Sequence, residues 1–509
     1  MAFHGSHGRL GGKVDRAAVR LVENNGAGLR ELLPATIVQR AVDAEEVRFR
    51  DSLFTPLVTL WLFLAQVLSH DGSCREAVAR LLAFLSARGA VAQPDADLAN
   101  PQTGPYCKAR KRLPERLVSR LARETGQQLH DRYPSGMLLG GRKVKVVDGT
   151  HCSMPDTPEN QKQWPQAGTQ KPGLGFPLVR LVAVMSLHCA AVLDLAMGPY
   201  KGKRTGEPAL LRTLLQSLES GDVLLADRYF ASFWMIASLL AIGVDSLFRQ
   251  HQLRKIDFRS GRRLGGDDHV IVMKKPAQRP DWMSKAAYAR MPEELTVREV
   301  RIQVVQKGFR VRTLVLVTTL LDVQLYNKQE LARAFRLRWH VELDLRAIKQ
   351  TMKMSILRCK TPAMVRKEIW MHLLAYNLIR TLMAQAAELA GVDPREVSFA
   401  GTVQTVNAFA PMLELADPVD APKLLEILLR IIARHRVGNR PNRYEPRAVK
   451  RRAKPIALLM IPRQEAKRRL AKSQTSSFVF SRIQVVNTGM NDAVIDPSPT
   501  SRRKRFGMR

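Results

Sequence analysis

Near residue 140 the hydrophobic pattern of the chain changes its period, and this change limits the fold more than any other signal. Upstream, apolar residues recur every three or four positions in the segments 17–33, 59–68, 74–85 and 113–129, a spacing that predicts amphipathic helices. Downstream, short apolar runs alternate with helical segments. We therefore expect a helical region up to about residue 135 and a sheet after it.

The downstream elements follow a definite order. Strands are expected at 143–147, 177–187, 190–197, 221–226, 244–249 and 311–320. Helices are expected at 206–220, 232–242, 328–354 and 362–389. Residues 177–187 and 190–197 form a hairpin in this interpretation. The resulting β-β-β-α-β-α-β order predicts an α/β fold, in which a mixed sheet carries helices on its faces.

Residues 251–310 interrupt this order because they are polar, basic and carry short alternating runs. This pattern predicts a β-rich insertion. Three domains are then expected: a helical N-terminal domain at 1–135, an α/β domain with the insertion at 136–390, and a basic C-terminal region at 391–509 that ends in a disordered tail.

The charge balance points to a polyanionic partner. The chain has 81 Lys and Arg against 46 Asp and Glu, which gives a net charge of +35 and a sequence pI near 10.6. Such a surface attracts nucleic acid. The N-terminal helices, with basic residues around 110–120, either recognise DNA or cap the neighbouring domain. The C-terminal basic segments either bind phosphates or form a solvated face.

Membrane association and a disulfide framework are not expected. The apolar stretch 53–68 carries no charge over 16 residues, fewer than the roughly 20 that span a bilayer, and no apolar signal segment is visible at the N-terminus. The five cysteines are odd in number and none are spaced as Cys-x-x-Cys. This usage fits a reducing, cytoplasmic compartment.

Three acidic residues are the strongest candidates for chemistry. Asp148 and Asp227 each end an apolar run, and Glu342 lies in the long helical segment 328–354. Two strand-end aspartates and a helical glutamate can hold two Mg²⁺ ions about 3.5–4 Å apart, the arrangement used for in-line phosphoryl transfer. In so basic a chain, the substrate of that chemistry is expected to be nucleic acid.

The helix around Glu342 offers further candidates. Phe335, Arg338, Glu342 and Lys349 fall on one stripe of a regular helix. Arg338 and Lys349 would then be placed to bind phosphate oxygens beside the metal site. An ordinary surface helix with an Arg338–Glu342 ion pair explains the same residues when they are taken alone.

The spacing of these four residues resembles the Tyr-x2-Arg-x3-Glu-x6-Lys signature of the insertion sequence four family of bacterial DDE transposases. Asp148-Gly-Thr and Asp227-Arg-Tyr-Phe resemble the family's two aspartate motifs. The segments that begin at Asp71, Tyr106, Thr318 and Leu374 are similar to family text as well. The resemblance covers roughly residues 45–385. Phe335 departs from the signature, because the family has tyrosine at that position.

The resemblance implies an RNase H-like fold in which Asp148, Asp227 and Glu342 bind two Mg²⁺ ions, with Mn²⁺ as a substitute. It implies cleavage at the ends of a mobile element, a hairpin intermediate and strand transfer into new DNA. It also implies a cytoplasmic, nucleoid-associated protein that works on double-stranded DNA as a homodimer in a synaptic complex.

Several residues outside the acidic trio are expected to support this chemistry. Arg338 and Lys349 are the stronger candidates for DNA-phosphate binding, while Arg228, Lys201, Lys203 and Arg204 are weaker ones, since loop cations are often only solvated. Phe335 keeps the ring but lacks the tyrosine hydroxyl, so we expect weaker substrate positioning and intact metal chemistry.

Two other functions remain open at this point. One is a catalytically inactive DNA-binding regulator of transposase descent, which a replaced carboxylate would favour; none of the three is replaced. The other is an RNase H-like structure-specific nuclease. Terminal inverted repeats in the DNA that flanks the gene would favour transposition over the nuclease.

Overall fold

A computed structural model describes residues 32–47, 53–88, 102–133, 138–303, 313–417, 419–438 and 459–481. The chain divides into two compact units, one of residues 1–170 with 175–450 and one of residues 171–174 with 451–509. The second unit contains the basic helix α16 (Arg463–Ser481). The tail after residue 481, expected to be disordered, lies outside the described residues. All other elements below belong to the first unit.

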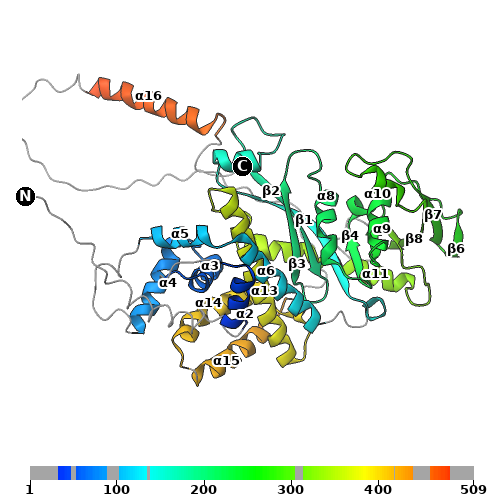
Figure 1. Cartoon of the computed structure of the whole chain (residues 1–509), viewed down its shortest axis with the longest axis horizontal. Helices are drawn as coiled ribbons and strands as arrows, with labels where there is room; N and C mark the ends of the chain where they lie inside the picture. Colours follow the sequence, from blue (N-terminus) through cyan, green and yellow to red (C-terminus); the bar gives the residue numbers. More distant parts are fainter. Residues whose placement is uncertain are drawn as a thin grey trace, which may run out of the picture. The chain divides into compact units, whose positions relative to one another are not determined.

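A single mixed sheet organises the first unit (Figure 1). Its strands are β1 (Val144–Ser153), β2 (Leu178–Ser186), β3 (Val192–Pro199), β4 (Val223–Ala226), β5 (Asp245–Arg249), β6 (Arg262–Gly265), β7 (Asp268–Lys274), β8 (Glu294–Gln303) and β9 (Thr313–Thr318). They lie in the order β3-β2-β1-β4-β5-β9-β8-β7-β6. The strands expected within the insertion are present, and they continue the central sheet.

Strand directions divide this sheet into two parts. β1, β2 and β3 pair antiparallel, whereas β4 and β5 run parallel to β1. β9, β8, β7 and β6 then continue antiparallel from β5. The expected mixed sheet and the hairpin between its second and third strands are confirmed.

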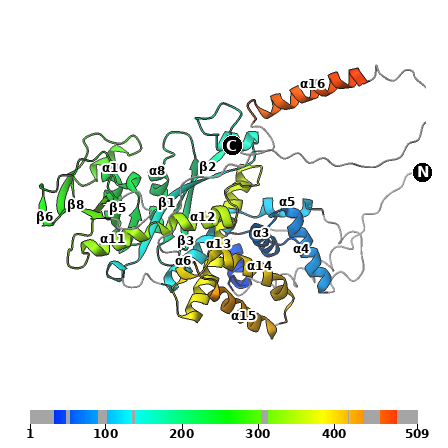
Figure 2. The same ribbon diagram turned by 180° about the vertical axis from the view of Figure 1, so that it is seen from behind.

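Helices cover both faces of the sheet because each strand buries side chains on alternating sides. Val144 and Val146 join one apolar core, and Val147 joins another. The helices over the first face are α6 (Glu115–Arg132), α11 (Lys328–Leu337), α12 (His340–Arg346) and α13 (Pro362–Ala390), several of which lie in front in Figure 2. The helices over the second face are α8 (Glu207–Leu211) and α9 (Phe233–Leu240).

Further helices pack on α13, either directly, as α3, α14 and α15 do, or through neighbouring helices. They are α2 (Ala35–Ala44), α3 (Pro56–Leu68), α4 (Cys74–Ala87), α5 (Gly104–Arg112), α14 (Phe399–Leu415) and α15 (Asp420–Arg434). The apolar stretch at 53–68 forms α3, which is buried on nearly all sides. Among the helices of the described ranges, none is long and apolar enough to cross a membrane.

One sequence-based expectation about the site was wrong. β1 does not end at Asp148; it continues to Ser153 because Gly149 to Ser153 keep pairing with β2. The expected helical segment 328–354 is present, but its hydrogen bonds are not uniform. They span three residues around Arg338–Trp339, between α11 and α12, where the dihedral angles stay helical, and the segment ends in the π-helical turn η5 (Ala347–Thr351).

Candidate active site

Asp148 lies where β1 extends beyond its neighbour β4. The last β1–β4 pair is Val146 with Leu225, so two residues further along each strand Asp148 stands opposite Asp227. Because alternate side chains share a face, Asp148 points to the same side of the sheet as Val146. That side is the one covered by α12.

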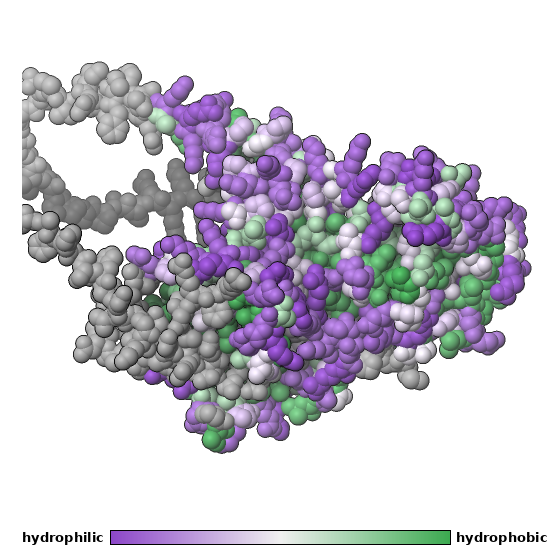
Figure 3. Space-filling model, viewed as in Figure 1, coloured by the Kyte–Doolittle hydropathy of each residue, from purple (hydrophilic) through white to green (hydrophobic). Residues whose placement is uncertain are grey.

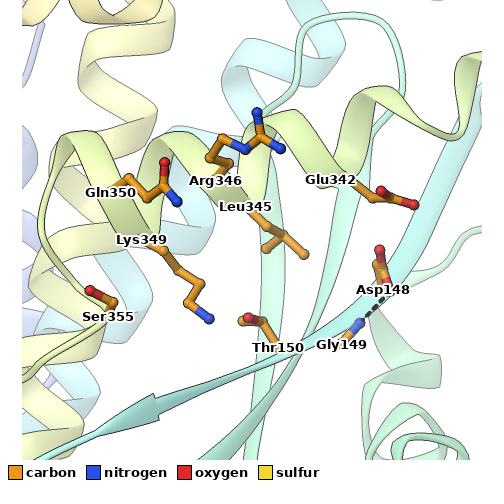
Figure 4. A pocket seen from close by; sticks show the side chains of 9 residues that line it. All are labelled: Asp148, Gly149, Thr150, Glu342, Leu345, Arg346, Lys349, Gln350 and Ser355. Carbon is orange, nitrogen blue, oxygen red and sulfur yellow. Dashed lines mark hydrogen bonds between the residues drawn. The ribbon is translucent and has the colours of Figure 1, made fainter. Parts of the chain in front are cut away.

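Asp148 and Glu342 line a common pocket of about 440 Å³ together with Thr150, Lys349 and Ser355. Figure 4 shows the carboxylate of Glu342, from α12, directed toward the carboxylate of Asp148, on β1. The structure therefore brings two of the three expected acidic residues to one cavity, from elements almost 200 residues apart in the chain.

Arg338 lies between these two carboxylates. Its Nη1 is 4.0 Å from Asp148 Oδ2 and its Nη2 is 3.5 Å from Glu342 Oε1, and its side chain is only 7% exposed. The expected Arg338–Glu342 ion pair is present, and Lys349 lines the same pocket as Glu342. The Arg338 guanidinium is buried against the acidic residues.

A buried ion cluster fixes α12 to the helices behind it. Asp344, two residues after Glu342, is 3% exposed and contacts Arg380 of α13 at 2.6 Å and Arg395 at 3.1 Å. Arg380 also donates to the hydroxyl of Tyr376. Since α12 has only seven residues, these contacts determine where Glu342 stands.

Asp227 follows β4 and is partly buried. Its Oδ1 is 3.9 Å from Nη1 of Arg249, at the end of the neighbouring strand β5. The same oxygen is buried and accepts no hydrogen bond from the described residues. Asp227 does not line the pocket that holds Asp148 and Glu342.

The electrostatics of the site favour a bound cation. Burial raises the pKa of Asp148 to about 6, with smaller contributions from Glu207 and Glu342; the hydrogen bond from the Gly149 amide and the charge of Arg338 act in the opposite direction. A partly buried carboxyl group with like-charged neighbours is stabilised by a positive ion.

No three Asp, Glu, His or Cys side chains in the described ranges stand close enough to form a ready-made metal site. The donor types still suit a hard divalent ion, because carboxylate oxygens are its preferred ligands. The unsatisfied Oδ1 of Asp227 and the raised pKa of Asp148 fit such an ion.

Lys349 and Phe335, two other residues expected at the site, lie in different surroundings. Lys349 lines the pocket, although the π-helical turn rotates it relative to Glu342. Phe335 is 1% exposed and packs in the core, with its ring 5.5 Å from the Arg338 guanidinium. Its contribution is therefore to hold Arg338, and its side chain is not at the surface.

The expected loop cations lie on two connections around the site. Lys201, Lys203 and Arg204 are exposed in the connection between β3 and α8, where Arg204 donates to the Asp281 carbonyl. Arg228 directly follows Asp227 and donates to Gln252.

Sequence reasoning missed Glu207, the first residue of α8. Its carboxylate lies against the backbone of Gly149, next to Asp148. Burial raises the pKa of Glu207; Asp227 adds to this rise, and Arg180 opposes it. The only sequence signal was a glutamate beside a glycine and a proline at a helix start, which is too common to single out.

Comparison with known proteins identifies similar transposases. The transposase DDE domain family matches residues 139–378, which include all three acidic residues. The chain is 28% identical over 443 residues to transposase InsG for insertion sequence element IS4 of Escherichia coli (strain K12), covering 85% of this chain and 93% of that protein.

A solved structure of a piggyBac transposase synaptic complex with hairpin DNA is also similar, with a TM-score of 0.38, 8% identity, and coverage of 82% of this chain and 85% of that chain. A likeness at this level is too remote to place the residues of the site.

The α/β fold, the acidic pocket and the domain match together define a DDE transposase, an enzyme of polynucleotidyl transfer that acts on DNA. Within that class, the chain is similar over most of its length to the transposase of insertion sequence element IS4.

Proposed function

We propose that this transposase cleaves DNA at the ends of its insertion sequence and transfers the ends to target DNA, with Asp148, Asp227 and Glu342 as its catalytic residues. One observation carries the proposal: Asp148 and Glu342 share a pocket, and Asp227 stands opposite Asp148 on the adjacent parallel strand. The proposal therefore draws on two residues of one pocket and on a third at the end of the neighbouring strand β4.

The five strands around the site support an RNase H-like core. Their order is β3-β2-β1-β4-β5, with three antiparallel strands followed by two that run parallel to the first. In this interpretation the strands of 251–310 are the insertion, and residues 1–135 and 391–509 are the flanking N- and C-terminal regions.

The acidic trio is proposed to bind two Mg²⁺ ions, for which Mn²⁺ substitutes. When bound, this pair supplies Lewis acidity to both sides of an in-line displacement at a phosphodiester. Because the trio does not form a compact cluster in the described residues, a small movement of Glu342 or Asp227 must accompany binding. Arg338, between Asp148 and Glu342, neutralises the carboxylates until that movement occurs.

The surrounding cations are proposed to position DNA. Lys349 lies in the pocket and is placed to contact a phosphate of the cleaved strand. Arg338 can turn from the carboxylates to the same phosphate, while Arg228 and the exposed cations between β3 and α8 contact the duplex further away. Two protomers, each on one element end, are proposed to form the synaptic complex.

Cleavage of a labelled element-end duplex in Mg²⁺ tests the catalytic assignment. Asp227→Asn and Glu342→Gln should each lower the cleavage rate by about 10²-fold or more, the scale of losing one preorganised electrostatic contact in a transition state. Glu426→Gln, on exposed α15, is the matched control and should cleave as the wild type does.

Each alternative has its own outcome in this experiment. Wild-type protein that binds the ends without cutting them would support an inactive regulator. Equal cutting of unrelated branched DNA would support a structure-specific nuclease. Unchanged cleavage by Asp227→Asn and Glu342→Gln would overturn the assignment of the trio.

A further inference from the structure

We propose that a second pocket, next to the one that holds Asp148 and Glu342, binds the DNA outside the insertion sequence: the donor flank before cleavage and the target afterwards. The inference rests on the proposed function and adds a subsite to it. The second pocket has a volume of about 580 Å³ and lies along α11 and α12. Besides Glu342, its lining includes Arg336, Trp339, His340, Leu343 and Arg346.

The two pockets meet at Glu342 and Arg346, which line both of them. Arg336 lies about two helical turns before Glu342, and Lys349 lies about two turns after it. Figure 4 shows the Arg346 guanidinium directed away from Asp148 and Lys349. A DNA strand whose scissile phosphate is held at Glu342 must continue in both directions. The first pocket can hold the strand on one side of that phosphate, and the second pocket can hold it on the other.

Two cations of the second pocket are available to phosphate oxygens. Arg336 and Arg346 are exposed, and within the described residues neither guanidinium forms an ion pair or a hydrogen bond. The guanidinium of Arg338, by contrast, is held by Asp148 and Glu342. An unpaired guanidinium suits phosphate because its planar fork offers two parallel donors. Charge complementarity therefore favours a nucleic-acid strand as the occupant of this pocket.

The remaining lining suits bases and sugars. Leu343 is 54% exposed, and Trp339 and His340 add two aromatic rings at the start of α12. Burying exposed apolar surface is favourable, and a base or a sugar that packs here would bury it. Bases of every identity stack on aromatic side chains because each has a flat π face. The second pocket can thus hold a strand without reading its sequence.

The composition of the two pockets favours a different part of the DNA for each. The first pocket contains the amide of Gln350 and the hydroxyl groups of Thr150 and Ser355, which can form hydrogen bonds with base edges. The second pocket has no amide or hydroxyl side chain among its described lining residues. DNA outside the element differs at every insertion site, whereas the element end is constant. The sequence-tolerant pocket therefore suits the outside DNA.

Affinity for two matched DNA substrates tests the inference on the full-length protein, in a chelator so that no strand is cut. One substrate is an element end with flanking duplex, and the other is the same end without the flank. Arg336→Gln should weaken binding of the flanked substrate about tenfold or more, the scale of one charge-assisted contact, and leave the flankless substrate unchanged. Arg333→Gln, an exposed cation one turn earlier on α11, is the matched control and should change neither.

Leu343→Glu is an independent variant, because it places a negative charge in the second pocket and removes no cation. Since Leu343 is exposed, the fold should be kept. This variant should weaken binding of the flanked substrate only. Two results would contradict the proposal: an equal loss of affinity for both substrates in Arg336→Gln, or unchanged affinity for the flanked substrate in both variants.

Strand transfer separates this inference from the proposed function. With pre-cleaved ends in Mg²⁺ and limiting target DNA, Arg336→Gln should transfer more slowly than the wild type, and saturating target should restore the rate because only target affinity is lost. Normal transfer at limiting target, with Asp227→Asn and Glu342→Gln inactive, would remove only this inference. Wild-type protein that cuts no element end would remove the proposed function, and the two-substrate comparison would still decide whether the second pocket binds DNA.

Discussion

At the scale of one residue, the raised pKa of Asp148 lowers the stability of the metal-free protein at neutral pH. Burial and two glutamates raise its pKa to about 6 from an ordinary value of 3.8. For a carboxyl group whose pKa is raised by folding, stability is fully present below the ordinary value and is lost as pH rises through the raised one. The ionised group therefore destabilises the metal-free protein at neutral pH.

Asp148→Asn should stabilise the metal-free protein at pH 7.5 by up to about 3 kcal/mol, because a tenfold change in the acidity of a group is worth about 1.4 kcal/mol and folding raises this pKa from 3.8 to about 6. The gain should disappear near pH 4, where the wild-type carboxyl group is protonated in the folded state. Urea unfolding in a chelator at the two pH values measures both. A gain of equal size at pH 4 would mean that packing, and not charge, is responsible.

The shared pocket of Asp148 and Glu342 agrees with the sequence pattern, which singled out both residues after an apolar run or in a long amphipathic segment. The contact of Glu207 with Gly149 could not be predicted, since it joins positions 58 residues apart and depends on the missing side chain of Gly149. The burial of the Arg338 guanidinium could not be predicted either, because its partners come from both β1 and α12.

At the scale of elements, α12 is a short helix whose position depends on what lies behind it. Asp344 is buried and shared between Arg380 and Arg395, so it connects α12 to α13 and to the turn after it. Glu342 faces the pocket from the opposite side of this helix. The placement of Glu342, the proposed catalytic glutamate, thus depends on the buried carboxylate of Asp344.

Asp344→Asn should cost about 3–5 kcal/mol of unfolding free energy, because it leaves two buried guanidinium groups without their counter-charge. End cleavage should fall while DNA binding is kept, measured well below the melting temperature. The exposed pair broken by Glu426→Gln should cost no more than about 0.5 kcal/mol. Similar stability of the two variants would contradict the role given to the buried cluster.

Local sequence pattern predicted the strands and the long helical segment well, but not the details of the helix. The apolar runs at 177–187 and 244–249 became β2 and β5 within two residues at each end, because burial on both faces produces those runs. The segment 328–354 is helical, yet its hydrogen bonds change at Arg338–Trp339 and it ends in a π-helical turn. A local hydrophobic period does not record such changes in hydrogen bonding.

At the scale of the whole molecule, the net charge of +35 is the dominant property. The face in Figure 3 is hydrophilic over most of its described residues, while hydrophobic side chains gather over α9. The helix α16, in the second unit, carries the exposed residues Arg463 and Lys467. Replacing these two residues tests whether local charge or total charge governs DNA binding.

DNA affinity should fall steeply with salt, by about 10³-fold or more between 50 and 200 mM, if six or more phosphates are contacted. Removing two charges from α16, as Arg463→Gln with Lys467→Gln, should lower the slope of log affinity against log salt by about 2, since each contacted phosphate contributes about 0.9. The matched control removes two exposed charges from α15, as Lys423→Gln with Arg430→Gln, and should leave the slope nearly unchanged. Equal loss in both pairs would assign binding to total charge, and a salt-independent affinity in the wild type would refute phosphate contact by the basic surface altogether.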